Sequence, residues 1–454
     1  MSLESIMNID INEFYSNIDQ IIKNKTEKKL VLTSTQKETI SLSDEDDIVE
    51  ALNGAIEKKD YKLSKALNQY LACIEVDNKR IVYKHLPVII HAEISSFCNC
   101  ECIMCTHCYE KNDRAKYLDL DAIERFLPTC RFMVINGIGE LFIHPRIVEI
   151  LSKLKEYQVQ LSVTTNAQYI PADTLPIIGD IFRRVCVSCD GASKNTYEKI
   201  RRGSSFDIFR NNCRMLRATL KEESIFTMSV VSMKQNLLET VDIVHLAKEL
   251  GFDEVRFGRL STNPFIGNEN DSINSYPNLS TMLMNEAMKT GEAIGIKVVI
   301  PVIYENEEYS ILEAENEKEC LLCSLMYRDA DYYENLYLKY KELYRKGIFE
   351  PTKYSMEGSF KCNGICHWVA YGININSDSQ LRPCGEIVRG KSVDDDQDLK
   401  LKNLMNNNEA MRLREVFISG MIPDCCMNCS YLMGHENELL SFDSHELRKI
   451  FIEV

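Results

Sequence analysis

Between residues 86 and 260, short β-rich runs alternate with segments of helical periodicity, and this alternation limits the possible fold more than any other feature of the chain. Nearly continuous apolar strands joined by helices are typical of a parallel sheet covered by helices. The sequence therefore predicts an α/β fold, a partial (β/α)6 TIM-like barrel, with its chemistry at the carboxyl ends of the strands. The six β-rich runs are Val88–Ile94, Phe132–Ile138, Val159–Thr164, Arg184–Ser188, Phe226–Met233 and Glu254–Leu260, and helical patterns between them include Ile147–Tyr157, Phe206–Leu220 and Leu238–Leu250.

The regions outside the alternation predict further domains, as expected for a chain of 454 residues. Residues 1–85 are expected to form a mainly helical accessory domain, with helices over Asp44–Lys59, capped by Ser43, and Tyr61–Ile74. A small hairpin over residues 29–42 precedes them. The barrel is assigned to residues 86–305, a helical linker region to 306–360, and a small Cys-rich α+β domain to 361–454.

Charge and hydropathy exclude several classes of partner. The formal net charge is −15, so a phosphate backbone is repelled on average, and we expect no nucleic-acid partner. No stretch approaches 18 uninterrupted apolar residues, so no membrane-spanning helix is expected. The first ten residues lack a basic region followed by an apolar run, which argues against a secretory signal. A cytoplasmic location is therefore expected.

The chain has 18 cysteines, and many of them are clustered. In a reducing compartment, clustered thiols more often bind metal or iron–sulfur centres than form disulfides. Cys98, Cys102 and Cys105 form a C-x3-C-x2-C set directly after a predicted strand, which suits three ligands of one [4Fe–4S] cluster and leaves one iron open. A zinc site is the alternative. Cys100 and Cys108 lie in the same segment and are interpreted as non-ligands.

Further motifs follow the second, third and fourth predicted strands. The second strand ends in a glycine-rich turn that contains Gly139 and Glu140, and the third ends in a Thr-Thr-Asn sequence at Asn166. Glycine permits close backbone approach, and a carboxylate accepts hydrogen bonds from an ammonium group. The fourth strand ends in Ser188-Cys-Asp190-Gly, and a Tyr-Glu-Lys-Ile-Arg-Arg-Gly sequence follows it.

Together these motifs resemble the radical S-adenosylmethionine superfamily. The resemblance implies that the open iron chelates the cofactor's methionine and that an electron from the cluster releases a 5′-deoxyadenosyl radical. It implies that Gly139, Glu140, Asn166, Ser188, Asp190 and Arg201 contact S-adenosylmethionine, with Arg202 as the competitor of Arg201. The turn departs from the family pattern at Ile138, where a glycine is common, and at Leu141, where a proline is usual.

A second cysteine group lies in the last hundred residues. Its sequence around Cys366-x-Trp, a short β-hairpin and Pro-Cys resembles the auxiliary-cluster domains called SPASM and twitch, and the small number of later cysteines fits the shorter, single-cluster twitch form. The expected ligands of this auxiliary [4Fe–4S] cluster are Cys366, Cys384, Cys426 and Cys429, with Cys362 and Cys425 as alternates. A structural zinc ribbon is the rival interpretation. Cys320 and Cys323 form a further pair and stay unassigned.

Three functions are compatible with these motifs. The resemblance favours an enzyme that oxidises, crosslinks or epimerises a side chain of a peptide or protein. The first alternative is a dehydrogenase of a small polyol, aminocyclitol or sugar, and the second is a metal-binding scaffold without catalysis. Either enzyme implies an external one-electron reductant of the flavodoxin or ferredoxin type. The sequence does not identify the catalytic residue that exchanges the second proton or hydrogen.

Overall fold

A nine-stranded sheet is the largest sheet in the described part of the chain. The computed structural model describes residues 7–10, 30–33, 39–42, 44–108, 116–261, 268–301, 309–326, 366–377, 381–382, 405–406 and 408–420. Within them, the order of the nine-stranded sheet is β12-β11-β10-β8-β7-β6-β4-β13-β14. Its strands are β4 (Ile89–Ala92), β6 (Phe132–Ile135), β7 (Gln160–Thr165), β8 (Phe182–Ser188), β10 (Ile225–Ser232), β11 (Glu254–Arg259), β12 (Lys297–Val299), β13 (Gly372–Ile375) and β14 (Leu381–Arg382). All neighbours are parallel except β13 and β14.

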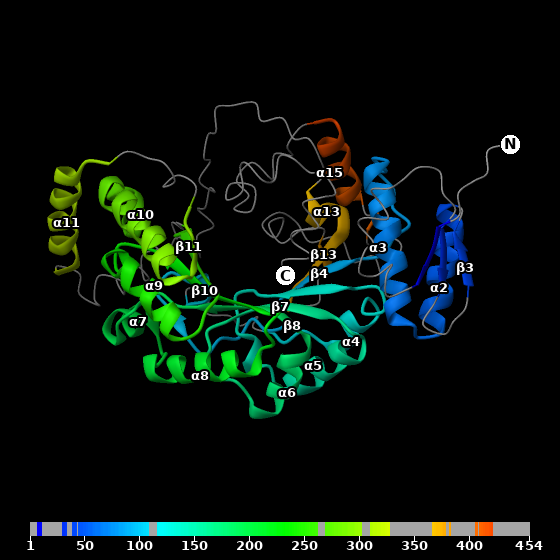
Figure 1. Ribbon diagram of the computed structural model, residues 1–454, viewed down its shortest axis with the longest axis horizontal. Helices are drawn as coiled ribbons and strands as arrows, with labels where there is room; N and C mark the ends of the chain where they lie inside the picture. Colours follow the sequence, from blue (N-terminus) through cyan, green and yellow to red (C-terminus); the bar gives the residue numbers. More distant parts are fainter. Residues whose placement is uncertain are drawn as a thin grey trace, which may run out of the picture.

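The predicted α/β barrel architecture is confirmed. The six predicted strands, β4, β6, β7, β8, β10 and β11, lie side by side in sequence order, and helices connect them. Figure 1 shows α5, α6 and α8 along one face of the sheet, as expected for the outer layer of a partial barrel. The connecting helices are α4 (Leu120–Glu124), α5 (Ile147–Glu156), α6 (Leu175–Ile181), α7 (Lys194–Ile200), α8 (Phe206–Thr219), α9 (Thr240–Glu249) and α10 (Pro277–Ile294).

Helical spacing of apolar residues explains how these helices cover the sheet. In α5 the buried residues are Ile147, Ile150, Leu151 and Leu154, which lie on one side of a helix. They join one hydrophobic core with alternate residues of the strands, such as Val185 of β8 and Val255 of β11. Because side chains alternate along a strand, the residues between these face the concave side of the sheet.

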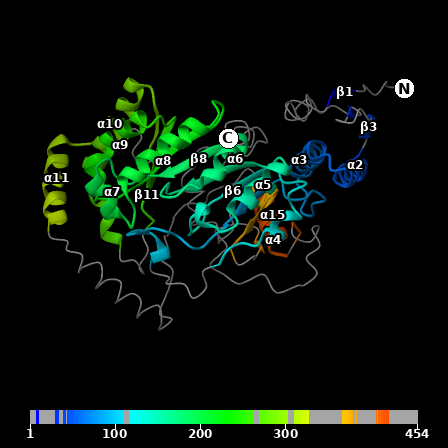
Figure 2. The ribbon, with the colours of Figure 1, turned by 90° about the horizontal axis from the view of Figure 1, so that it is seen from below.

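The sheet extends beyond the six barrel strands at both edges. At one edge β12 pairs with β11, and at the other β13 pairs with β4, with Gly372 opposite Ile89. The hairpin predicted after Cys366 is present as β13 and β14, and it continues the barrel sheet. Figure 2 shows α11 (Ile311–Met326) and α2 (Glu45–Glu57) at opposite ends of the molecule. Among the described helices, none is both long and apolar enough to cross a membrane.

The N-terminal helices pack directly on the segment that follows Cys366. A small sheet of β1 (Met7–Asp10), β2 (Leu30–Thr33) and β3 (Thr39–Leu42), in which β2 and β3 form the predicted hairpin, precedes α2 and α3 (Tyr61–Asp77). Leu67 and Leu71 of α3 share a second hydrophobic core with Tyr371 and Phe417. These two residues belong to α13 (His367–Tyr371) and α15 (Asn408–Ile418), which lie beside α3 in Figure 1.

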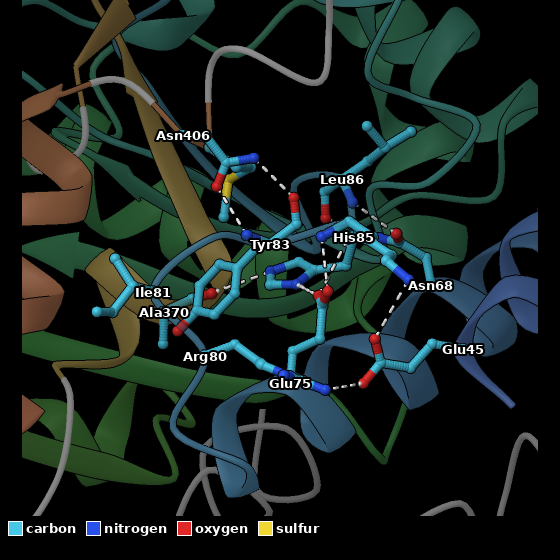
Figure 3. Close-up of polar contacts among 12 residues, drawn as sticks. Glu45, Asn68, Glu75, Arg80, Ile81, Tyr83, His85, Leu86, Ala370 and Asn406 are labelled. Atoms are coloured by element: carbon cyan, nitrogen blue, oxygen red, sulfur yellow. Dashed lines mark hydrogen bonds and ion pairs between the residues drawn. The ribbon is translucent and has the colours of Figure 1, made fainter.

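A buried hydrogen-bond network around Glu75 and His85 connects α3 to α13 (Figure 3). The Nδ1 of His85 lies 2.6 Å from an oxygen of Glu75, and its Nε2 lies 3.0 Å from the carbonyl oxygen of Ala370 in α13. Glu75 also accepts hydrogen bonds from the backbone N–H groups of Lys84 and His85, at 2.6 and 3.1 Å. Burial alone would raise the pKa of Glu75, but its contacts with His85 hold this pKa below its usual range.

Glu75→Ala is expected to lower the free energy of unfolding by about 3 kcal/mol, because it leaves a buried imidazole and two backbone N–H groups without their acceptor. Urea unfolding followed by circular dichroism measures this loss. Glu45→Ala is the matched control, since Glu45 pairs with the half-exposed Arg80 and Lys84 and is expected to cost less than about 1 kcal/mol. Equal losses of unfolding free energy in both variants would contradict a stabilising role for the buried hydrogen bonds of Glu75.

Candidate functional site

The first cysteine loop begins at the carboxyl end of β4 and is held by a short strand pair. β5 (Glu101–Cys102) pairs antiparallel with β9 (Arg201–Arg202), which follows α7. The N–H of Ile103 donates to the carbonyl of Ile200 at 3.0 Å, and the N–H of Cys105 donates to the carbonyl of Cys102 at 3.0 Å. The loop is therefore fixed to the segment that follows β8, on the side of the barrel where chemistry is expected.

Two hydrogen-bond donors point at sulfurs of the predicted ligands. The Nδ2 of Asn166 lies 3.7 Å from the Sγ of Cys98, and the Nη1 of Arg201 lies 3.7 Å from the Sγ of Cys102. Such donors favour the thiolate form and tune an iron–sulfur centre. Within the described residues, no three His, Cys, Asp or Glu side chains gather closely enough for a single metal ion. A cubane is larger, and each of its thiolates binds a different iron, so the donor set fits a [4Fe–4S] cluster.

Cys98 and Cys100 have opposite protonation preferences although they lie side by side. The hydrogen bond from Cys100 lowers the pKa of Cys98, and the same contact together with burial raises the pKa of Cys100. Burial also raises the pKa of the predicted ligand Cys102 to about 12, although the charge of Arg201 opposes this. The protonation preferences of the loop without a cluster therefore do not assign the ligands, and the assignment rests on the C-x3-C-x2-C spacing. The side chain of Cys108 lies outside the described residues.

A buried ion pair joins the fourth strand to the cysteine loop. The Oδ2 of Asp190 lies 2.8 Å from the Nη2 of Arg201, and both side chains are almost fully buried. The Oδ1 of Asp190 accepts from the N–H of Val231, at 2.7 Å, at the end of β10. Burial raises the pKa of Asp190, and the positive charge of Arg201 opposes this rise. Arg202, the competitor of Arg201, is exposed.

One atom of this pair suits a bound anion. The Nε of Arg201 is buried and has no hydrogen-bond partner among the described residues. A buried guanidinium N–H without an acceptor is costly, and a carboxylate is the acceptor that fits it best. Arg201 therefore suits the role that the family resemblance implies, contact with the carboxylate of S-adenosylmethionine. The residues present fit both the cluster and this cofactor.

Glu140 connects the second and third strand ends. Its carboxylate accepts hydrogen bonds from the Oγ1 of Thr165 and the N–H of Asn166, each at 2.7 Å, and its N–H donates to the carbonyl of Phe97 at 2.7 Å. Burial raises the pKa of Glu140 to about 7, although the hydrogen bonds from Asn166 and Thr165 oppose this. Beside it, a Cβ on Gly139 would lie 2.1 Å from the carbonyl oxygen of Ser95, so glycine is required there.

Ser188 has a different environment from the other predicted cofactor residues. It is the last residue of β8, lies opposite Ser229 of β10, and is half-buried. Within the part of the chain that is described, its hydroxyl group makes no hydrogen bond. The hydroxyl is therefore free to contact a bound molecule on the concave face.

The predicted auxiliary ligands are described only in part. Cys366 is buried and immediately precedes α13, and its carbonyl accepts from the N–H of Ala370 at 2.9 Å. Cys384, Cys426, Cys429 and the alternates Cys362 and Cys425 lie outside the described residues. Glu93, just after β4, accepts from the Oγ of Ser377 at 2.7 Å, so the segment after Cys366 contacts the barrel next to the cysteine loop. Cys320 and Cys323 are exposed on α11.

Sequence reasoning missed the residues that support the predicted site. Asn99 accepts from the amide of Asn166 at 2.7 Å, and Thr165 holds Glu140. Asn236 donates to the carbonyl of Asp190 at 3.2 Å. Each is an ordinary polar residue near a motif, and only its partner, distant in sequence, reveals its role.

An ionic cluster lies on the concave face of β8, β10, β11 and β12. Glu254 is buried and accepts from the Nη1 of Arg184 at 2.5 Å and the Nε of Arg256 at 2.6 Å. The Oγ1 of Thr227 donates to it at 2.8 Å, and the Nζ of Lys297 lies 3.8 Å away. Burial raises the pKa of Glu254, but Arg256 and Arg184 outweigh this and hold the pKa at about 2.

Glu254→Gln is expected to destabilise the protein at neutral pH and to a smaller extent in acid. Because the pKa of Glu254 is depressed in the fold to about 2, its stabilising contribution is complete above the ordinary glutamate pKa and is lost as the pH falls from about 5 toward 2. Melting temperatures of both proteins at pH 7 and pH 3.5 measure the effect. The exposed Glu222→Gln serves as the control. A difference that grows in acid would contradict the assignment.

The fold and the cysteine loop together agree with the sequence resemblance to the radical S-adenosylmethionine superfamily. No family profile matches the chain. A curated relative is the antilisterial bacteriocin subtilosin biosynthesis protein AlbA of Bacillus subtilis (strain 168), which is 26% identical over 179 residues. This match covers 36% of the chain and 38% of AlbA, so the chain spans well under half of that relative.

The crystal structures of Streptococcus suis SuiB have a similar fold. SuiB bound to S-adenosylmethionine has a TM-score of 0.51 at 15% identity, over 90% of this chain and 93% of SuiB. SuiB bound to the precursor peptide SuiA has a TM-score of 0.50 at 13% identity, over 85% of this chain and 89% of SuiB. At these identities the likeness is one of fold, and it extends over most of both chains.

Proposed function

We propose that the chain is a radical S-adenosylmethionine enzyme that modifies a side chain of a peptide or protein. The cofactor is cleaved reductively to a 5′-deoxyadenosyl radical, which abstracts hydrogen and leads to oxidation, a crosslink or epimerisation. The observation that carries this proposal is the cysteine loop at the carboxyl end of β4, with Arg201 and Asn166 donating to two of its sulfurs. AlbA acts in bacteriocin biosynthesis, and SuiB binds a precursor peptide, which supports a peptide substrate.

The chain's own residues hold and orient the reactants. The first cluster, which supplies the electron when bound, is held by Cys98, Cys102 and Cys105. Arg201, fixed by Asp190, meets the cofactor carboxylate with its unpartnered Nε, and Ser188 offers its hydroxyl from the concave face. Gly139, Glu140 and Asn166 complete the cofactor site.

The remaining assignments are part of the same proposal. Cys366, Cys384, Cys426 and Cys429 hold an auxiliary [4Fe–4S] cluster, and a flavodoxin or ferredoxin is the external reductant. Residues 1–85 form an accessory domain, 86–305 the barrel, 306–360 a linker region and 361–454 the auxiliary domain. A cytoplasmic location fits the cluster chemistry, since free thiols persist in a reducing compartment.

Anaerobic reconstitution with iron and sulfide, then dithionite and S-adenosylmethionine, tests the proposal. We expect iron near about eight per chain, as for two cubanes, and 5′-deoxyadenosine detected by mass spectrometry. A zinc-loaded protein that releases no 5′-deoxyadenosine would support the scaffold alternative. Incubation with peptides encoded beside the gene, followed by peptide mass measurement, separates peptide from small-molecule substrates. Because epimerisation leaves the mass unchanged, the chirality of the hydrolysed residues is measured as well. Deoxyadenosine without any change in peptide mass or in residue chirality would favour the polyol dehydrogenase.

A further inference from the structure

The ionic cluster around Glu254 leaves positive charge on the concave face of the barrel. Val185 and Val255 are buried in the core on the helix side of the sheet. Because side chains alternate along a strand, Arg184, Glu254 and Arg256 therefore face the concave side. Their mutual hydrogen bonds agree with this placement.

The charges of this cluster do not balance. Among the described residues, two guanidinium groups and the ammonium of Lys297 surround a single carboxylate, Glu254, which leaves an excess of two positive charges. The neighbouring inward positions of β8 and β10 are Cys186, Ser188 and Ser229, and none of them carries a compensating acid. In a chain with a net charge of −15, this local excess favours an anionic ligand.

Arg256 is the member of the cluster that is open to a ligand. Its side chain is 38% exposed, whereas those of Arg184 and Glu254 are 14% and 4% exposed. Its Nε and Nη2 contact Glu254, and its Nη1 has no partner among the described residues. The next inward position on β11 is Gly258, where a Cβ would meet only the carbonyl oxygen of Val230, at 3.7 Å. The space beside the guanidinium therefore contains no side chain from its own strand.

This open guanidinium lies close to the proposed radical site. Arg256 is opposite Ser229, which is opposite Ser188 at the end of β8. Further along β11, Gly258 is opposite Val231, whose N–H donates to Asp190. The strand then reaches Leu260, which packs in one hydrophobic cluster with Ile103 of the cysteine loop. The four-residue step from Arg256 to Leu260 spans roughly 13 Å of strand. A bound peptide residue and its neighbours can bridge this distance.

We propose that Arg256, supported by Arg184, binds a carboxylate of the substrate peptide and thereby sets which residue enters the barrel. The carboxylate is either an acidic side chain or the peptide's own C-terminus. A guanidinium pairs with a carboxylate in a planar, bidentate geometry, which fixes both position and orientation. The inference rests on the proposed function and deepens it, because a neutral polyol has no group for this site.

Isothermal titration calorimetry tests the inference. The reconstituted protein, with S-adenosylmethionine present, is titrated with each of three small probes. N-acetyl-glutamate amide carries a side-chain carboxylate, N-acetyl-alanine a terminal carboxylate, and N-acetyl-glutamine amide neither. We expect at least one carboxylate probe to bind about tenfold more tightly than the amide, as for a charge-assisted hydrogen bond. The tighter of the two acids identifies the source of the carboxylate. Equal affinity for all three probes overturns the proposal.

Two variants separate ligand binding from folding. Arg256→Gln removes the charge, and Gly258→Val fills the adjoining space but keeps the charge. Both are expected to reduce the affinity for the acid probe to that for the amide. The matched control is Arg210→Gln, because Arg210 pairs with Glu249 on the outer helices. If Gly258→Val folds, as judged by its melting temperature, and binds the acid as tightly as the unmodified chain does, the proposal is wrong.

A second readout keeps this inference distinct from the proposed function. Both variants are expected to form 5′-deoxyadenosine from S-adenosylmethionine at the unmodified rate without any peptide, because neither residue contacts the cofactor residues named above. If the unmodified chain forms no 5′-deoxyadenosine, the result contradicts the proposed function but not the carboxylate site. Formation of deoxyadenosine without any carboxylate preference contradicts the carboxylate site alone.

Discussion

Simultaneous replacement of Cys98, Cys102 and Cys105 by alanine is expected to abolish the formation of 5′-deoxyadenosine and to remove about four iron atoms per chain. In the proposed function these three thiolates hold the first cluster, which would supply the electron for cleavage of the cofactor. We expect the rate to fall at least about a thousandfold, which corresponds to roughly 4 kcal/mol. Iron analysis and mass spectrometry of the reconstituted variant measure both effects.

Cys100→Ala is the matched control within the same loop. Cys100 is buried and lies outside the C-x3-C-x2-C set, so its removal is expected to leave the iron content unchanged and to preserve at least half of the activity. If the Cys100 variant lost its iron as the triple variant does, the ligand assignment would be wrong. A triple variant that kept its iron and still released 5′-deoxyadenosine would falsify the whole proposal.

Local periodicity accounts for the parts of the fold that the sequence could predict. Each of the six barrel strands lies within two or three residues of its predicted run, and α5 starts at the predicted Ile147. These elements follow from side chains close together in the sequence, which set the alternation of strands and the spacing of helices. Capping was predicted wrongly, since the N-cap of α2 is Asp44, whose side chain accepts the N–H groups of Asp46 and Asp47. Ser43, the predicted cap, lies outside the described residues.

Long-range contacts were beyond what the sequence could predict. Nothing in the segment after Cys366 indicates that β13 adds to the edge of β4, or that α3 packs against α13. The edge of β4 is available because the barrel is open there, and the apolar face of α3 needs a partner. Both contacts join residues far apart in the sequence, so no local pattern records them.

The candidate site shows the same division between local and distant information. The three cysteines and the motifs after each strand are local, and the roles proposed for them come from the family resemblance that these motifs carry. The hydrogen bond from Asn166 to Cys98 and the packing of Leu260 on Ile103 each join different strands. The ionic cluster around Glu254 gave no signal in the sequence, because single charged residues within strands are common.

The ion pair between Arg201 and Asp190 leads to the second large prediction. Arg201→Leu is expected to reduce the free energy of unfolding by about 3–5 kcal/mol, because it leaves the buried carboxylate of Asp190 without its partner. Urea unfolding of the variant followed by circular dichroism measures this loss. Arg202→Leu is the matched control, since Arg202 is the exposed neighbour in the same strand and is expected to change stability by less than about 0.5 kcal/mol.

A double variant separates the structural role of Arg201 from its role toward the cofactor. Adding Asp190→Asn to Arg201→Leu removes the unpaired buried charge, so part of the lost stability is expected to return. Binding of S-adenosylmethionine is not expected to return, because the double variant still lacks the buried, unpartnered Nε that we propose to meet the cofactor carboxylate. Calorimetric titration with S-adenosylmethionine measures this difference. If the stabilised double variant bound the cofactor as tightly as the unmodified chain, Arg201 would serve the fold alone.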